Sequence, residues 1–575
     1  MGLPDGSPVL LRPHPGRRRE KPQLSCNSCR QRKRKCDRQR PCSHCIKRHL
    51  ESTCTYTDSS SPSSESRQLH ADPSATYDSS PSASGLAVIH PTEFLKRYNA
   101  FWEDPIAASV SWLGLLYSIF CLTTQVQSQE SCLSRAPETS SCPLPSTEMP
   151  RILVYREKVV QCLIQAQFAK GGPDIMETLV HYIVIENNLN KDSNIGVWLL
   201  MGNIVQIAIR MGYHRDPRHF KSLSPYQGEM RRRMWAMIYS LDTGFATQMG
   251  LPSSIKHSLS DTAPPRNLQN SDFEACSTEL PPARPIDELT SSTVIITKFH
   301  VAVCMGVVSD MVSSPHALTP EDILAANGKL ETTYSSLPRP CQFRPMSESL
   351  LDPPSVVSQA SSMAIPQRRG YTDLLTCSSS GQRINFYMHY QRARILINWK
   401  FLGTSQEPTD SDQSWSVVIE AALEILRLQH LMGEESEVLD ASRPTGIPDS
   451  CFMNNGYFLA ASVACFIVQH RKDKLSPQDL TEVRSLLERS LAIWSSTNDL
   501  SREASKVVMA LRVVLGKPEE LGPQVREVPD AYGRSEIPFS SFTSFFDDLP
   551  LMMADADNTG FPSLMDYWPQ GDGSM

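Results

Sequence analysis

Residues 26–54 read CNSCRQRKRKCDRQRPCSHCIKRHLESTC. The six cysteines in this segment are separated by 2, 6, 5, 2 and 8 residues, so two Cys-x2-Cys pairs stand on either side of a short loop. Each pair can hold one metal ion from a tight turn, and a tetrahedral set of thiolates selects Zn²⁺ over hard cations. The other ten of the 16 cysteines are scattered without such spacing. The sequence therefore predicts that this end of the chain folds around zinc.

Two zinc ions need eight ligand positions, which six sulfurs fill only if two of them bridge both ions. Such a binuclear cluster has a formal charge of −2, because six thiolates surround two divalent ions. Cations stand next to it in the sequence, since residues 30–35, RQRKRK, hold five Lys and Arg in six positions. This pattern predicts a basic segment attached directly to the metal centre.

The spacing and the basic segment resemble the fungal Zn2Cys6 binuclear-cluster transcription factors, and residues 26–37, CNSCRQRKRKCD, match the first half of that motif closely. The resemblance implies two zinc ions with six ligands. By it Cys26 and Cys42 bridge the two ions, one ion adds Cys29 and Cys36, and the other adds Cys45 and Cys54. The family is regulatory and not enzymatic.

The same resemblance implies how DNA is bound. The family places its first short helix in the major groove, where the lysine three residues before the third cysteine reads the guanines of a CGG triplet. That residue is Lys33 here, and guanine offers its ammonium two acceptors, O6 and N7. The expected phosphate contacts, which give affinity but little sequence choice, are Arg30, Arg32, Arg34 and Lys35.

Two other interpretations of this segment stay open. The zinc module could serve protein contacts alone, and the basic run could be a nuclear-import signal or a solvated face. All six spacings together with the embedded basic run favour DNA binding.

Charge is divided unevenly along the 575 residues. Residues 1–57 hold 14 Lys and Arg against four Asp and Glu, a net charge of +10, which leaves −16 for the remainder of a chain of net charge −6. This polarity indicates nucleic acid as a partner at one end only. The first residues lack the pattern of a secretory signal, so we expect the protein to stay in the cell and to work in the nucleus.

We expect no membrane partner. The apolar run 112–122 has 11 residues, whereas a spanning helix needs about 20. The longer apolar segment 195–211 contains Asn203, Gln206 and Arg210. Both segments are better interpreted as buried helices.

The chain is expected to comprise five segments. Residues 58–84 contain 11 serines and one large aliphatic residue, Leu69, and cannot bury enough surface to fold. No heptad repeat is visible near this linker, so a homodimer, if formed, would use the helical body. The segments are a basic disordered arm (1–25), the zinc module (26–54), a Ser/Pro-rich linker (58–89), an all-α regulatory body (90–515) and a disordered acidic-aromatic tail (516–575).

The body shows helical periodicity and no long strand-type alternation. Helices are predicted over 224–248 and 286–314, among others, and 262–285 is predicted as a loop. Ser224, Pro225 and Gln227 predict a capping box at the start of the first of these. The body also resembles the middle homology region of the same family, a regulatory region, in residues 198–202 (WLLMG), 210–217 (RMGYHRDP), 229–235 (EMRRRMW) and 250–252 (GLP).

Catalytic motifs are not apparent: no His-Glu-x-x-His, Gly-x-Ser-x-Gly, P-loop or dinucleotide-type glycine triplet occurs. The best acid–base candidate is His214 beside Arg215 and Asp216, which is more simply interpreted as a hydrogen-bond network at a helix end. We therefore expect no enzyme.

Residues 536–575 hold seven acids, seven aromatics and no Lys or Arg. This composition is typical of segments that bind transcription coactivators through short amphipathic anchors, and the alternative is a tail that docks on its own helical body. The combined prediction is a zinc-dependent activator that binds CGG-type half-sites for RNA polymerase II and controls a fungal biosynthetic or secondary-metabolite gene cluster. A zinc-containing corepressor or scaffold and a metabolite-gated regulator of a catabolic pathway remain as alternatives.

Overall fold

The structure is a computed structural model, and it describes residues 35–37, 39, 42–48, 88–133, 148–190, 192–316, 318–343, 380–404, 408–439, 451–472, 475–497 and 502–516. The chain divides into two compact units, Met1–Pro73 and Ser74–Met575. The predicted arm and nearly all of the predicted linker and tail lie outside the described residues.

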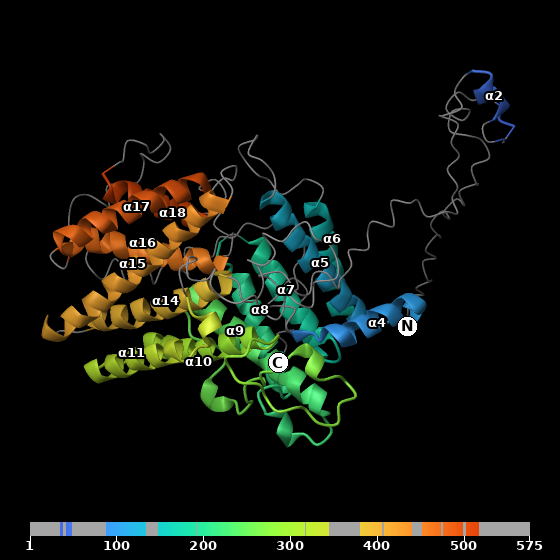
Figure 1. Cartoon of the computed structure of the whole chain (residues 1–575), viewed down its shortest axis with the longest axis horizontal. Helices are drawn as coiled ribbons and strands as arrows, with labels where there is room; N and C mark the ends of the chain where they lie inside the picture. Colours follow the sequence, from blue (N-terminus) through green and yellow to red (C-terminus); the bar gives the residue numbers. More distant parts are fainter. Residues whose placement is uncertain are drawn as a thin grey trace, which may run out of the picture. The chain divides into compact units, whose positions relative to one another are not determined.

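The second unit is built from helices joined by loops and short 3-10 turns, and the described residues contain no strand (Figure 1). This confirms the prediction of an all-α body. The helices are α4 (Pro91–Glu103), α5 (Val110–Leu133), α6 (Met149–Gln165), α7 (Ile175–Leu189), α8 (Ile195–Arg210), α9 (Pro225–Met249), α10 (Thr293–Ser313), α11 (Pro320–Ser335), α14 (Ser380–Thr404), α15 (Pro408–Leu439), α16 (Cys451–His470), α17 (Pro477–Thr497) and α18 (Arg502–Val514).

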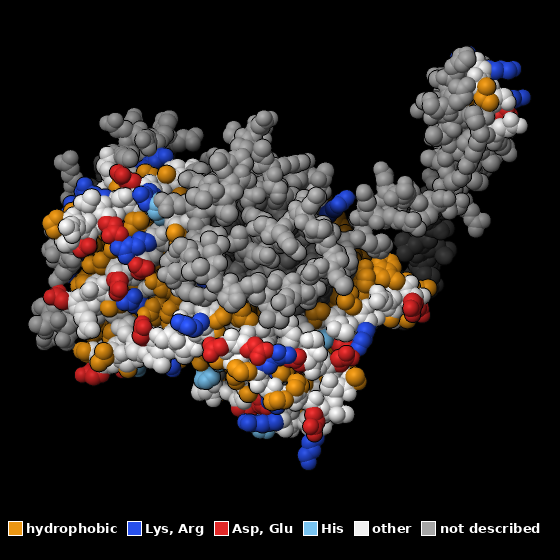
Figure 2. All heavy atoms as spheres, in the orientation of Figure 1, with side chains coloured by type: hydrophobic (Ala, Val, Ile, Leu, Met, Phe, Trp, Pro, Cys, Tyr) orange, Lys and Arg blue, Asp and Glu red, His pale blue; other side chains and the backbone are white. Residues whose placement is uncertain are grey.

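The body has two principal hydrophobic cores. Helices α4 to α9 enclose the first, in which Val88 and Ile89, at the end of the predicted linker, are also buried. Helices α14 to α18 enclose the second, where Trp415, Tyr457 and Leu487 are buried. Helix α10 packs against both α9 and α14 and so joins the two halves (Figure 1). Lys and Arg side chains are interspersed with Asp and Glu over the visible described surface (Figure 2).

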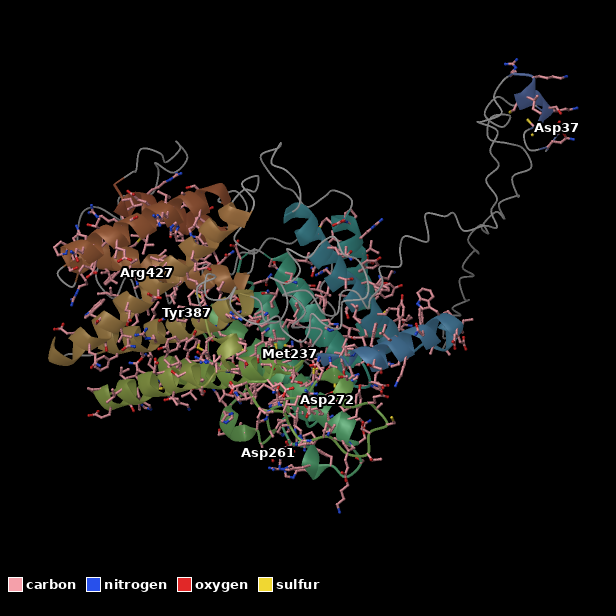
Figure 3. All side chains as sticks on the ribbon, in the orientation of Figure 1. Asp37, Met237, Asp261, Asp272, Tyr387 and Arg427 are labelled. Atoms are coloured by element: carbon pink, nitrogen blue, oxygen red, sulfur yellow. The ribbon has the colours of Figure 1, made fainter. Side chains whose placement is uncertain are left out.

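Helix α9 begins and ends where the sequence indicates. The Ser224 hydroxyl accepts a hydrogen bond from Gln227 N, and the Gln227 side chain accepts one from Ser224 N, which completes the predicted capping box. The helix ends at Gly250, whose φ of 67° lies in the left-handed region that glycine tolerates best. Residues such as Met237, in the middle of α9, face the first core (Figure 3).

Three consecutive arginines of α9 reach three different neighbours. Arg231 donates a hydrogen bond to the Met211 carbonyl at the end of α8 and stacks on Tyr213. Arg232 donates to Asp216, at 2.9 Å. Arg233 donates to Asn270 and Ser292, each at 2.7 Å. The run therefore ties one helix to the segments before and after it.

The loop between α9 and α10 is longer than predicted, because α10 begins at Thr293 and not at residue 286. The Asn267 amide donates to the carbonyls of Pro285 and Glu288, at 2.7 and 2.9 Å. These hydrogen bonds from the Asn267 side chain keep residues 285–288 in a non-helical conformation. Hydrophobic periodicity carries no information about such contacts. Asp261 and Asp272 belong to the same loop (Figure 3).

Helix α10 is the one described helix that is long and apolar enough to cross a membrane by length and composition. It has 21 residues, and half of its apolar window is buried inside the body. Ile296, Phe299 and Met305 are among the buried residues. This burial between α9 and α14 is that of a core helix.

Candidate metal centre and nucleic-acid interface

The described part of the first unit contains three of the six predicted zinc ligands. Cys42 and Cys45 have no exposed surface, and Cys36 is half-buried. The other three predicted ligands, Cys26, Cys29 and Cys54, lie outside the described residues. The same holds for the predicted DNA contacts Arg30, Arg32, Lys33 and Arg34, whereas Lys35 is described and exposed.

The structure brings two of the predicted ligands together. The sulfurs of Cys36 and Cys42 and a carboxylate oxygen of Asp37 all lie within 4.8 Å of one another. Two thiolates on one tetrahedral zinc ion, with Zn–S bonds of about 2.3 Å, have sulfurs about 3.8 Å apart. The approach of Cys36 and Cys42 therefore fits a shared zinc ion.

The second Cys-x2-Cys pair lies on a single helical turn, α2 (Ser43–Ile46), with Cys42 as its N-cap residue. The Cys42 carbonyl accepts hydrogen bonds from Cys45 N at 2.9 Å and Ile46 N at 3.0 Å. Both cysteines of the pair are thus held on one tight turn, which is the local geometry that Cys-x2-Cys zinc sites use. The Cys45 sulfur does not belong to the group formed by Cys36, Asp37 and Cys42.

Asp37 fixes the loop that joins the two halves of the motif. Its carboxylate accepts hydrogen bonds from the Ser43 hydroxyl and, at 3.0 Å, from Ser43 N at the start of α2. The bond from the Ser43 hydroxyl, followed by that from its backbone, lowers the pKa of Asp37 (Figure 3). The group thus offers two sulfurs and one carboxylate oxygen, and the sulfurs are the donors that suit zinc.

The role of Asp37 was not predicted from its sequence position. One feature of the sequence could have drawn attention to it: Asp37 is an acidic residue that directly follows a predicted ligand cysteine within a basic stretch. Asp37 and Ser43 are six residues apart, a separation that matches neither the repeat of a helix nor that of a strand. The contact could therefore not be predicted from the sequence.

Cations surround the described part of this centre. Lys35, Lys47 and Arg48 are exposed, and Asp37 is the one acid among the described residues of this unit. A thiolate cluster of net negative charge is stabilised by such cations, and exposed cations also suit a polyanionic partner. The exposed cations thus agree with the basic, DNA-binding character that the sequence motif predicts.

The alternative catalytic candidate in the body is a structural network. Asp216 has no exposed surface and accepts hydrogen bonds from Arg232 and from Ala263 N. Burial raises its pKa, but the bonds from these donors outweigh burial and lower the pKa overall. The neighbouring Arg215 and His219 both bind Asp261, at 3.1 and 2.8 Å. The His214 carbonyl accepts a hydrogen bond from Asp261 N at 3.1 Å, so its backbone belongs to the same network, whereas its ring Nδ1 has no hydrogen-bond partner among the described residues.

Comparison with known families identifies one domain in each unit. Residues 24–63 match the fungal Zn(2)-Cys(6) binuclear cluster domain. Residues 82–314 match the fungal specific transcription factor domain.

Several relatives with similar sequences are cluster transcription factors. The pyrrolocin cluster transcription factor fsdR of Fungal sp. (strain NRRL 50135) is 36% identical over 444 residues, which cover 74% of this chain and 54% of the relative. The fusarisetin A cluster transcription factor fsa6 of Fusarium sp. (strain FN080326) is 35% identical over 75% of this chain and 55% of its own.

The equisetin cluster transcription factor eqxF of Fusarium heterosporum is 35% identical over 75% of this chain and 59% of its own. The chain thus spans little more than half the length of these relatives. The cluster domain it contains is one that holds two zinc ions. With both family domains in order along the sequence, the chain belongs to the fungal Zn2Cys6 transcription factors, a family of regulators and not of enzymes.

Proposed function

We propose that the protein is a sequence-specific, zinc-dependent transcription factor that works in the nucleus and binds CGG-type half-sites in double-stranded DNA. The observation that carries the proposal is the approach of the Cys36 and Cys42 sulfurs beside exposed cations. Zinc folds a module that is too small to have a core of its own, and the folded module presents its basic residues to DNA.

The proposed ligand set uses all six cysteines of the motif. Cys36 and Cys42 hold the same ion, which agrees with their proximity, and Cys29 completes that site with the bridging Cys26. The second ion shares the bridging pair Cys26 and Cys42 and adds Cys45 and Cys54. Burial of Cys42 and Cys45 on one helical turn supports their assignment as ligands.

The proposed DNA contacts divide into two kinds. Lys33 reads guanine through O6 and N7 in the major groove, which supplies sequence choice. The phosphate contacts are Arg30, Arg32, Arg34 and Lys35, of which Lys35 is exposed beside the metal centre. Binding of this kind releases counterions from the DNA, so its affinity falls steeply as the salt concentration rises.

The remaining segments complete the proposed organisation. A linker (58–89) joins the zinc module (26–54) to the helical regulatory body (90–515). The tail (516–575) binds transcription coactivators through its acids and aromatics and so activates RNA polymerase II. Any pairing of two copies uses the helical body. Because the relatives named above are cluster transcription factors, we assign this chain to a biosynthetic or secondary-metabolite gene cluster.

The proposal is tested by the binding of the full-length, zinc-loaded protein to duplexes that contain CGG or a scrambled triplet. Lys33→Ala is expected to reduce the preference for CGG by about 10-fold, which corresponds to about 1.4 kcal/mol, while nonspecific binding and its salt dependence remain. Lys21→Ala, in the predicted arm, is the control and keeps the preference. An unchanged preference in Lys33→Ala would remove this residue from base readout.

A further inference from the structure

A groove lies on the surface of the body between α15 and α17. Its volume is about 810 Å³, and the residues that line it include Leu431, Leu486, Arg489 and Arg427, the last of which is labelled in Figure 3. Leu486 is buried and Leu431 partly buried, so the floor of the groove is apolar.

The rim of the groove carries more positive than negative charge. Arg427 and Arg489 line it with a single acid, Glu482. Arg427 is engaged, because its guanidinium contacts Glu482 at 2.6 Å and Glu424 at 2.7 Å. Arg489 is exposed and makes no ion pair within the part of the chain that the structure describes. The groove thus offers one guanidinium to an incoming carboxylate above an apolar floor.

The described body ends after α18, which packs against α17, one of the two helices that line the groove. Val514 and Leu515, at the end of α18, belong to the same hydrophobic cluster as Leu480 of α17. Residues 517–544, 28 in number, separate the described body from Phe545. A chain of 28 residues can span up to roughly 90 Å when extended, which is enough to return to α17.

The segment that follows matches the groove in chemistry. Residues 545–548 are Phe-Phe-Asp-Asp, and residues 549–553 add Leu-Pro-Leu-Met-Met. Aromatic side chains suit the floor at Leu431 and Leu486, and the paired acids suit Arg489. We propose that residues 545–553 of the same chain dock in the groove between α15 and α17, with Asp547 or Asp548 on Arg489.

Attachment in the same chain makes this contact effective. Docking of a segment of the same chain is an intramolecular event, so its strength does not depend on the protein concentration and a contact of modest intrinsic affinity can be well populated. Docking covers the aromatics that the tail would present to coactivators. That regulatory consequence rests on the proposed function, whereas the docking itself involves neither zinc nor DNA.

The test uses the full-length, zinc-loaded protein with a benzophenone analogue of phenylalanine in place of Phe545. After irradiation, mass spectrometry locates the crosslink, and a mixture of isotopically light and heavy chains separates crosslinks within a chain from those between chains. We expect crosslinks within one chain to α15 or α17. Arg489→Glu reduces their yield at least fivefold, whereas Arg484→Glu, an exposed arginine of α17 outside the groove, leaves it unchanged.

Exchanging the charges of the two proposed partners distinguishes loss of docking from an unrelated effect of Arg489→Glu on the protein. Asp547→Arg with Asp548→Arg, added to Arg489→Glu, is expected to restore the crosslink yield. Crosslinks elsewhere, crosslinks between chains, or a yield that Arg489→Glu does not alter would each overturn the proposal. CGG binding, measured on the same preparations, reports separately on the proposed function.

Discussion

At the scale of single residues, the metal centre depends on a few short-range contacts. Cys36 and Cys42 approach each other across a loop, and Asp37 holds that loop by binding Ser43 at the start of α2. The sequence predicted the cysteines, because their spacing is itself the signature of the site. It did not predict the role of Asp37, because the partner of a carboxylate depends on how a loop closes and not on periodicity.

Cys36→Ala is expected to abolish specific DNA binding. The substitution removes a thiolate from the proposed zinc site, and a module without a core of its own unfolds when its metal site is incomplete. Binding to a CGG duplex by gel shift, with zinc content by atomic absorption, measures the effect. Cys276→Ala, at an exposed cysteine of the helical body, is the matched control and keeps both properties. Specific binding retained by Cys36→Ala would contradict the assignment.

Asp37→Ala is expected to weaken zinc binding about 10-fold, the lower end of the effect seen when a group that supports metal ligands is lost. The variant loses the acceptor for the Ser43 hydroxyl and backbone N–H, so the loop between Cys36 and Cys42 is less well held. Competition with a chromogenic chelator gives the affinity. Asp37→Asn keeps one acceptor oxygen and is expected to bind zinc more tightly than Asp37→Ala; equal affinities of Asp37→Ala and the unmodified chain would exclude the role.

At the scale of elements, α9 organises the body. Its start at Ser224 and its end at Gly250 were predicted from capping and turn residues, which act locally. The beginning of α10 was predicted wrongly, because Asn267 binds the carbonyls of Pro285 and Glu288 from a distance in sequence. Local signals therefore located the helices well, while tertiary hydrogen bonds set the length of the loop.

Arg233 and Glu229 are expected to govern the stability of this region. Both side chains are almost fully buried, 3.7 Å apart, and burial raises the pKa of Glu229 and lowers that of Arg233. Arg233→Met leaves Glu229 buried without its partner and also frees Asn270 and Ser292. We expect a loss of about 3–5 kcal/mol in the free energy of unfolding, measured by urea denaturation.

The double variant Glu229→Gln/Arg233→Met is the control for this pair. It removes the uncompensated charge, so it is expected to recover part of the stability lost in Arg233→Met. A loss for Arg233→Met below about 0.5 kcal/mol, the range of ordinary surface substitutions, would show that the loop does not depend on this contact.

At the scale of the whole molecule, the chain combines two units with separate sources of stability. The first unit depends on metal ligation, and the second has the hydrophobic cores of α4 to α18. The sequence predicted a zinc module and a helical body, because composition and cysteine spacing differ along the chain. The groove between α15 and α17 was not predicted, since it forms from side chains of helices that are distant in the sequence.

Zinc removal is expected to affect one unit and spare the other. Treatment with a strong chelator should abolish DNA binding, because thiolate repulsion and the lack of a core unfold the module. The far-ultraviolet circular dichroism of the helical body should remain within a few per cent of its starting value. A collapse of the helical signal on chelation would show that the body also depends on the metal.

In-vitro selection from random DNA with the full-length, zinc-loaded protein tests most directly the claim that this chain reads sequence. The account predicts enrichment of CGG triplets: a single triplet would indicate a monomeric reader, and two at a fixed spacing would indicate a pair joined through the helical body. Folded, zinc-loaded protein that enriches no sequence would contradict the claim.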